Sequence, residues 1–184
     1  MSTSSAPEWL RLRDIIQQRS LRTDRIYVLS SGEKSGHYFD MKPTTFNTEG
    51  LNLICKLIYG IVAERYGIYV GGLAVGAVPI VSGLVFYSAA RVPLMGFCVR
   101  EEIKNHGTQR LIEGNIEDGV DVVIIDDVTT KGASAMKAVE AVRQRHCNVI
   151  KVVTIVDRLE GAKETFRREG LEFISLFTTK DFIH

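Results

Sequence analysis

The sequence has few of the features that mark a metal site, a disulfide framework or a membrane anchor. Its 184 residues include three cysteines, Cys55, Cys98 and Cys147, and no pair of them has the CxxC spacing of a metal or redox site. So few and so widely spaced, they are expected to be free thiols in a reducing compartment. The N-terminal stretch MSTSSAPEWLRLRD lacks the apolar segment of a signal peptide, and every apolar run is interrupted before it reaches membrane-spanning length. We therefore expect a soluble, cytoplasmic protein with no membrane partner.

The sequence also lacks an excess of charge of either sign. Lysine and arginine number 23 against 22 acidic residues, a formal net charge of +1. Such a balance gives no general attraction to nucleic acid, and no helix-turn-helix pattern is evident, so we expect no nucleic-acid partner. Hydrophobic residues make up 45% of the chain. A chain of this length and composition is expected to form one domain with a sizeable core.

Strand and helix patterns alternate from residue 48 onward. Strands are expected near 68–73, 93–100, 121–126, 149–157 and 172–182, and helices near 48–67, 77–91, 133–146 and 162–170. Such alternation predicts an α/β fold with a central, mainly parallel sheet that is flanked by helices. In sheets of this kind ligands bind beyond the carboxyl ends of the strands.

The first 45 residues have a different pattern. Ser5 and Glu8, with Pro7 between them, form the capping box of a first helix, on which Trp9, Leu12 and Ile16 share one face. Residues 25–45 contain short apolar runs on either side of SSGEKSG, the pattern of two strands joined by a turn. We expect a single domain, 1–184, with a small N-terminal hood of about 1–45 and a core of about 46–184.

The stretch VVIIDDVTTKGAS, residues 122–134, ends a buried strand with two neighbouring carboxylates and a loop of small residues. Carboxylates accept hydrogen bonds from the vicinal hydroxyls of a sugar. The loop leads into a helix whose first amides have no intrahelical partners and therefore favour a phosphate, and Gly132 lets the backbone approach it. This combination suits a ribose 5-phosphate. The alternative is an ordinary helix that begins after a strand, because Asp and Thr favour helix starts.

This element resembles the phosphoribosyl-diphosphate motif of the type I phosphoribosyltransferases, which needs the apolar strand, both acids and the Thr- and Gly-rich loop together. The resemblance implies the fold of that family. It also implies a set of residues that bind phosphoribosyl diphosphate: Asp126, Asp127, Thr129, Thr130, Lys131, Gly132, Ala133 and Ser134.

The polar stretch REEIKNHGTQRLIEG, residues 100–114, is the second candidate element. A solvated loop is the ordinary interpretation of such a charge run, but long unstructured loops in compact domains usually act as lids or binding segments. Its KNHG spacing resembles the catalytic loop of the orotate phosphoribosyltransferases. That resemblance implies that Arg100, Lys104 and His106 close over the diphosphate and are catalytic, and that residues 100–114 form a mobile lid.

Other stretches are similar to the same family, so that the resemblance runs from about Arg25 to Gly161. SGEKSGHYFDMK is similar to its orotate-contacting hairpin, VGGLAVGAVPI to its diphosphate-contacting turn, and VDRLEG contains an arginine where the family has one facing the orotate carboxylate. The implied orotate contacts are Tyr38, Phe39, Thr130 and Arg158. The implied reaction is transfer of ribose 5-phosphate from phosphoribosyl diphosphate to orotate, giving orotidine 5'-phosphate and diphosphate in de novo pyrimidine (UMP) biosynthesis.

The resemblance further implies a cofactor and a partner. Mg²⁺ is expected to be bound through substrate and water rather than directly by the protein, and a homodimer is expected in which the lid is shared between subunits. Two alternatives stay open: a phosphoribosyltransferase that acts on another base, and a non-catalytic regulator that senses phosphoribosyl diphosphate. A dinucleotide-binding site is excluded, because GGLAVG does not meet the GxGxxG spacing.

The sequence departs from the family pattern at four positions. Glu101 and Ser30 stand where family members often have a lysine, and Gly76 stands where some members have a lysine and others have Gly. Lys131 lies inside the phosphate loop, where Thr or Ala is more usual. His37, His146 and His184 are interpreted as surface or core residues without a matching partner, and Cys98 is expected to be buried.

Overall fold

The computed structural model describes residues 7–28, 34–63, 66–102 and 110–183. Its central sheet has six strands in the order β10-β9-β8-β5-β6-β7. They are β5 (Ile68–Leu73), β6 (Met95–Val99), β7 (Ile112–Gly114), β8 (Asp121–Thr129), β9 (Asn148–Asp157) and β10 (Phe173–Thr178). Every pairing is parallel except that of β7 with β6. The predicted α/β fold with a mainly parallel sheet is confirmed.

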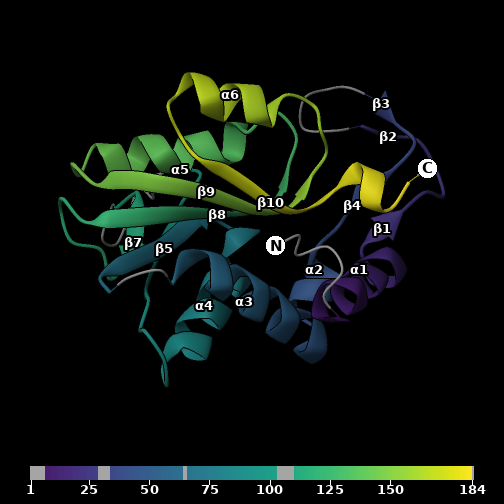
Figure 1. Ribbon diagram of the computed structural model, residues 1–184. Helices are drawn as coiled ribbons and strands as arrows, with labels where there is room; N and C mark the ends of the chain where they lie inside the picture. The colour runs from purple at the N-terminus through teal and green to yellow at the C-terminus, as the bar shows by residue number, and fades with distance from the viewer. Residues whose placement is uncertain (1–6, 29–33, 64–65, 103–109, 184) are drawn as a thin grey trace.

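Helices cover both faces of this sheet (Figure 1). One face carries α3 (Thr48–Val62) and α4 (Ala77–Ser88), beside α1 (Pro7–Arg19), and the other carries α5 (Ala133–Arg143) and α6 (Ala162–Arg168). Apolar side chains of the strands alternate between two clusters, one for each face. The sheet is therefore buried on both sides, which explains why β8 contains four consecutive apolar residues, 122–125.

The chain between α1 and α3 lies beyond one end of the sheet. There β1 (Leu21–Arg22) pairs with β4 (Tyr38–Phe39), and β2 (Tyr27–Val28) pairs with β3 (Lys34–Ser35), both antiparallel. A short helix α2 (Lys42–Thr45) follows. The expectation of two strands joined by a turn over 30–36 is corrected: the described residues form four short strands, and Lys34 and Ser35 of the expected turn belong to β3. The first part of that turn, up to residue 33, lies outside the described residues. Trp9 of α1 donates from Nε1 to the Leu176 carbonyl at 2.8 Å and packs on Phe177, so α1 shares the main core. The division into a hood and a core stays a prediction.

The structure corrects several local expectations. Helix α3 ends at Val62 rather than near Gly67, and the polar stretch 100–114 ends in a strand, β7, that the sequence did not predict. Cys98 is half-buried rather than buried, and all three cysteines are unpaired. Ser5, and with it the predicted capping box, lies outside the described residues, whereas Trp9, Leu12 and Ile16 are buried together as expected.

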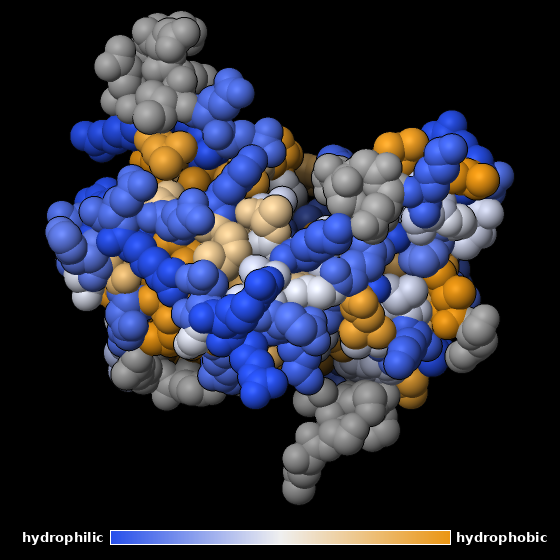
Figure 2. All heavy atoms as spheres, turned by 90° about the horizontal axis from the view of Figure 1, so that it is seen from above, coloured by the Kyte–Doolittle hydropathy of each residue, from blue (hydrophilic) through white to orange (hydrophobic). Residues whose placement is uncertain are grey.

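The surface above α5 and α6 is mainly hydrophilic, with scattered apolar areas (Figure 2). Within the described ranges, no helix combines the length and the apolar character that crossing a bilayer requires.

Candidate active site

Strand β8 carries the two candidate carboxylates into the protein. Residues Val122–Ile125 are fully buried, and the strand continues to Thr129, so that both acids lie within it. Asp126 is only 5% exposed, whereas Asp127 is half-buried. Asp126 nevertheless lies near the carboxyl end of β8, which ends at Thr129. Its Oδ1 accepts a hydrogen bond from the Asp127 amide at 3.2 Å, and its Oδ2 is buried without a hydrogen bond to any described residue.

The electrostatics of this pair favour a ligand that donates hydrogen bonds. Burial raises the pKa of Asp126 well above its ordinary value, and the neighbouring Asp127 raises it further. Burial also raises the pKa of Asp127, although a hydrogen bond from the Val128 amide, at 2.9 Å, and the positive charge of Lys42 oppose that shift. Sugar hydroxyls that donate to these oxygens would stabilise the charged carboxylates.

The loop after β8 has the geometry of an anion site. Gly132 is the residue before α5, with φ of +86°, and no side chain caps the helix. A Cβ at Gly132 would lie 2.8 Å from Phe166 Cζ, so both the backbone angle and the space require glycine. The Thr129 hydroxyl is buried without a hydrogen bond to the described part of the chain. Uncapped first-turn amides beside unsatisfied hydroxyls suit a phosphate.

A pocket of about 200 Å³ lies over these residues. It is lined on one side by residues from β4 to the start of α2, and on the other by residues from β8, the loop, the start of α5 and the position after β9: Tyr38, Phe39, Asp40, Met41, Lys42, Asp126, Asp127, Val128, Thr129, Thr130, Gly132, Ala133, Ser134 and Arg158. Asp40, Met41 and Lys42 were not predicted. They are the last three residues of the segment SGEKSGHYFDMK that resembles the orotate-contacting hairpin, and that position is the signal that could have pointed to them.

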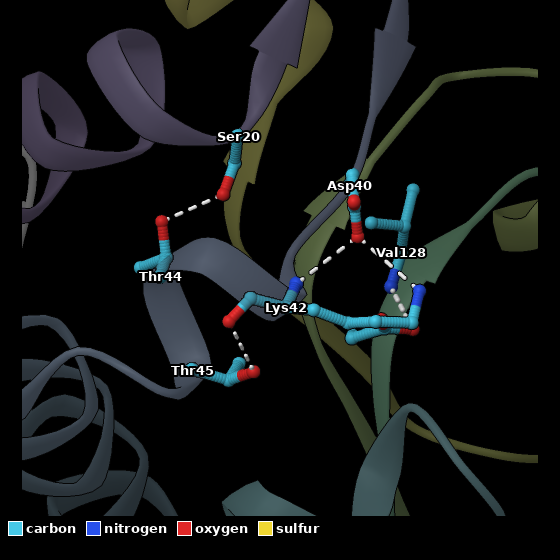
Figure 3. Close-up of polar contacts among 7 residues, drawn as sticks. Ser20, Asp40, Lys42, Thr44, Thr45 and Val128 are labelled. Carbon is cyan, nitrogen blue, oxygen red and sulfur yellow. Dashed lines mark hydrogen bonds and ion pairs between the residues drawn. The ribbon is translucent and has the colours of Figure 1, made fainter.

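Lys42 brings a positive charge to the carboxylates. Its side chain extends from α2, and its Nζ and amide both donate to Asp40 Oδ1 at 3.2 Å, close to the end of β8 (Figure 3). Behind it, Ser20 and Thr44 form a buried hydroxyl pair at 2.6 Å, and Thr45 contacts the Lys42 carbonyl (Figure 3). The short helix is thus held against α1, which fixes the place of the lysine at the pocket.

Arg158, immediately after β9, closes the far side of the pocket. Its amide donates to the Thr129 carbonyl at 3.0 Å, and its side chain is only 3% exposed. The guanidinium Nη2 donates to Ser35 Oγ at 3.0 Å and lies 3.4 Å from His37 Nε2. The expectation that His37 has no partner is therefore wrong, because the hairpin places its ring beside the candidate base-binding arginine.

The turn between β5 and α4 reaches the same site. A Cβ at Gly76 would lie 2.6 Å from Asp127 Oδ1. Any larger residue at position 76 would therefore move the Asp127 carboxylate. Glycine here, where some family members have a lysine, preserves the position of that acid.

Curated relatives identify the family, although no protein-family model matches the chain. The chain is 42% identical over 178 residues to an orotate phosphoribosyltransferase of Bradyrhizobium, which covers 94% of this chain and 96% of the relative. It is 40% identical over 176 residues to the orotate phosphoribosyltransferase of Aquifex aeolicus, and the match covers 94% of this chain and 96% of that relative. The chain belongs to the orotate phosphoribosyltransferase family.

Solved orotate phosphoribosyltransferases have the same fold. The Mycobacterium tuberculosis protein in complex with Fe(III) dicitrate superposes with a TM-score of 0.83 at 34% identity, covering 97% of this chain and all of that one. The same protein in complex with 5-phospho-α-D-ribosyl 1-diphosphate gives a TM-score of 0.79 at 32% identity, covering 96% and 99%.

The structure brings most of the residues predicted for an orotate phosphoribosyltransferase site around one pocket: Tyr38, Phe39, Asp126, Asp127, Thr129, Thr130, Gly132, Ala133, Ser134 and Arg158. Their individual roles stay predictions. Lys131 is exposed and does not line the pocket, and Arg100 forms an ion pair with Glu113 of β7 at 3.1 Å. Glu101 is exposed. Lys104, His106 and Ser30 lie outside the described residues.

Proposed function

We propose that this chain performs the reaction of its family, transfer of ribose 5-phosphate from phosphoribosyl diphosphate to orotate, in the pocket at the end of β8. The observation that carries the proposal is that three residues lining that pocket each have a buried polar atom without a hydrogen bond to any residue the structure describes: Asp126 Oδ2, the Thr129 hydroxyl and Arg158 Nε. Unpaired buried polar atoms cost free energy unless a ligand satisfies them. A phosphorylated sugar and a carboxylated base together offer partners for all three.

The sugar donor is proposed to lie along β8 and its loop. Asp126 and Asp127 would accept hydrogen bonds from the ribose hydroxyls, and the first amides of α5, with Thr129, Thr130 and Ser134, would bind the 5-phosphate. Lys42 would balance part of the charge that two carboxylates bring to one site. These contacts hold the anomeric carbon in a fixed position, which lowers the barrier by orientation.

The acceptor base is proposed to lie between the hairpin and β9. Tyr38 and Phe39 would pack near its ring, and the planar guanidinium of Arg158 matches a carboxylate in a way that lysine would not. The base nitrogen attacks the anomeric carbon as the bond to diphosphate breaks, so negative charge builds on the leaving group. Arg100, Lys104 and His106 are proposed to stabilise this charge, with His106 donating a proton.

Mg²⁺ is the proposed cofactor. The carboxylate oxygens of Asp126 and Asp127, which line the pocket, are the hard ligands or water acceptors that suit this ion. No group of three or more His, Cys, Asp or Glu side chains in the described ranges could hold a metal, so the substrate diphosphate and water would supply most ligands. Bound there, the ion would neutralise charge on the departing diphosphate.

A homodimer is proposed on the face around α4. Phe46, Val75 and Phe86 are 74%, 68% and 86% exposed, and two mainly apolar grooves of about 490 and 1050 Å³ flank Phe86. Exposed apolar areas of this kind often mark contact surfaces. Val75 precedes Gly76, whose Cα borders Asp127, so this face extends to the rim of the pocket. A second copy bound here would be placed to share its lid with the neighbouring site.

A cytoplasmic location stays a prediction, supported by three unpaired cysteines.

A panel of bases tests the proposed activity. The protein is incubated with phosphoribosyl diphosphate, Mg²⁺ and, in turn, orotate, uracil, adenine, guanine and hypoxanthine, and diphosphate release is followed. We expect release with orotate alone. Release with a purine base instead would make the acceptor wrong, and binding of the sugar donor without turnover of any base would favour a regulator.

A further inference from the structure

The side chain of Arg158 is held by residues that have no role in the reaction described above. Its Nη2 lies 3.0 Å from Ser35 Oγ, 3.4 Å from His37 Nε2 and 3.0 Å from Glu160 Oε1. Ser35 and His37 come from the N-terminal hairpin, more than 120 positions away, and Glu160 comes from the turn after β9. The guanidinium therefore connects the hairpin to the end of the sheet, and Glu160 supplies its opposite charge.

These contacts are unevenly distributed over the guanidinium. Nη2 carries two hydrogens and faces three acceptors, whereas Nε is buried and makes no hydrogen bond with any residue that the structure describes. The Oε2 atom of Glu160 is likewise buried and unpaired, so Glu160 binds through one oxygen only. Because these contacts use Nη2, the hydrogens of Nη1 are the ones left for a second carboxylate.

We propose that Glu160 and His37 are positioning residues that hold Arg158 by Nη2 and so orient its guanidinium in the pocket toward the carboxylate of the acceptor base. The inference rests on the proposed function and adds to it the side chains that set the preference for a carboxylated base. Neither residue lines the pocket, so both act through Arg158. Without Glu160, the buried guanidinium would lose its counter-charge and would be free to turn away from the base.

The protonation state of His37 supports this arrangement. Burial and the positive charge of Arg158 lower the pKa of His37, and the negative charge of Glu160 opposes them less strongly. The ring is therefore neutral near pH 7, so that Nε2 can accept a hydrogen bond from Nη2. The His37 ring also packs against Phe39, with ring centroids 6.1 Å apart and the ring planes nearly perpendicular. Protonation on acidification would turn this acceptor into a donor and repel Arg158, which weakens binding of the base.

Steady-state kinetics with Glu160→Gln tests the role of the counter-charge. We expect the KM for orotate to rise about tenfold or more, as when one charge-assisted hydrogen bond is lost. The kcat and the KM for phosphoribosyl diphosphate should stay within about twofold, because the loss is confined to ground-state binding of the base. Glu164→Gln makes the same change of charge at an exposed position of α6 and serves as the matched control.

A second pair of variants keeps the test valid if Glu160→Gln does not fold. His37→Phe removes the acceptor and should raise the orotate KM, and His37→Gln, which restores a neutral acceptor, should rescue most of the loss. The rise in orotate KM on acidification should also be smaller in His37→Gln than in the wild type.

Suppose that the wild type turns over orotate and that Glu160→Gln and His37→Phe both keep the wild-type KM for orotate. That result would overturn this inference and leave the proposed function standing. Equal increases of the KM for orotate and the KM for phosphoribosyl diphosphate in these variants would also overturn it, since they would indicate a general structural role. A wild type that does not use orotate would overturn the proposed function and this inference together.

Discussion

Asp126 combines deep burial, an unpaired oxygen and a charged neighbour in one side chain. A structural carboxylate at such a depth would ordinarily be paired or fully hydrogen-bonded. Here the residues around it leave Oδ2 unsatisfied, and Asp127 adds repulsion. The charged carboxylate of Asp126 therefore destabilises the folded protein when no ligand is bound. A hydrogen-bond donor that enters the pocket would offset that cost.

Asp126→Asn should therefore stabilise the protein and inactivate it. Because the pKa of Asp126 is raised on folding, its contribution to the free energy of unfolding is fully present below the ordinary carboxyl pKa of about 4. It is lost as the pH rises through the higher folded pKa. Asparagine cannot ionise, so unfolding by denaturant should show a gain of roughly 1–3 kcal/mol at about pH 8. The gain should be small at about pH 4.

Two measurements accompany that stability series. Glu140→Gln, at an exposed position of α5, removes one negative charge in the same chemical way and should leave stability nearly unchanged. Turnover of Asp126→Asn should fall by about 10²-fold, since one contact to the reacting sugar is lost. If Asp126→Asn is less stable than the wild type at neutral pH, or if it is fully active, the Asp126 carboxylate is not a destabilising charged group that serves ligand binding.

Helix α4 joins the proposed site to the proposed subunit contact. Its first residues follow the turn that borders Asp127, and further along it Phe86 is almost fully exposed between two apolar grooves. A helix that is apolar on its outer face as well as its inner face is expected to be covered in the working protein.

Phe86→Ser should weaken the dimer and leave the fold of each chain intact. Removal of one central aromatic side chain from an interface commonly costs about 2 kcal/mol, or roughly 30-fold in Kd. Sedimentation equilibrium should show a wild-type dimer and a shift of the variant toward monomer. Tyr66→Ser, an exposed aromatic that lines neither groove, is the control. A monomeric wild type, or a variant that associates as tightly as the wild type, would contradict the proposed contact.

At the scale of the whole molecule, most strands and helices could be predicted from sequence because they carry strong patterns. The four apolar residues of β8 and the amphipathic α3 are examples. Strand β7 could not be predicted, because it has three residues with one buried side chain and depends on β6 for its hydrogen bonds. The phosphate loop was predictable because its residues are contiguous. Lys42 and the His37–Arg158 contact were not, since they arise only when the hairpin folds over residues more than 80 positions away.

The account as a whole depends on where the sugar donor lies. A crystal structure of the protein with phosphoribosyl diphosphate and Mg²⁺ tests this most directly. We predict the ribose hydroxyls within hydrogen-bond distance of Asp126 and Asp127, and the 5-phosphate at the amides that begin α5. Density for the ligand at another place, with these carboxylates and the loop unliganded, would contradict the account.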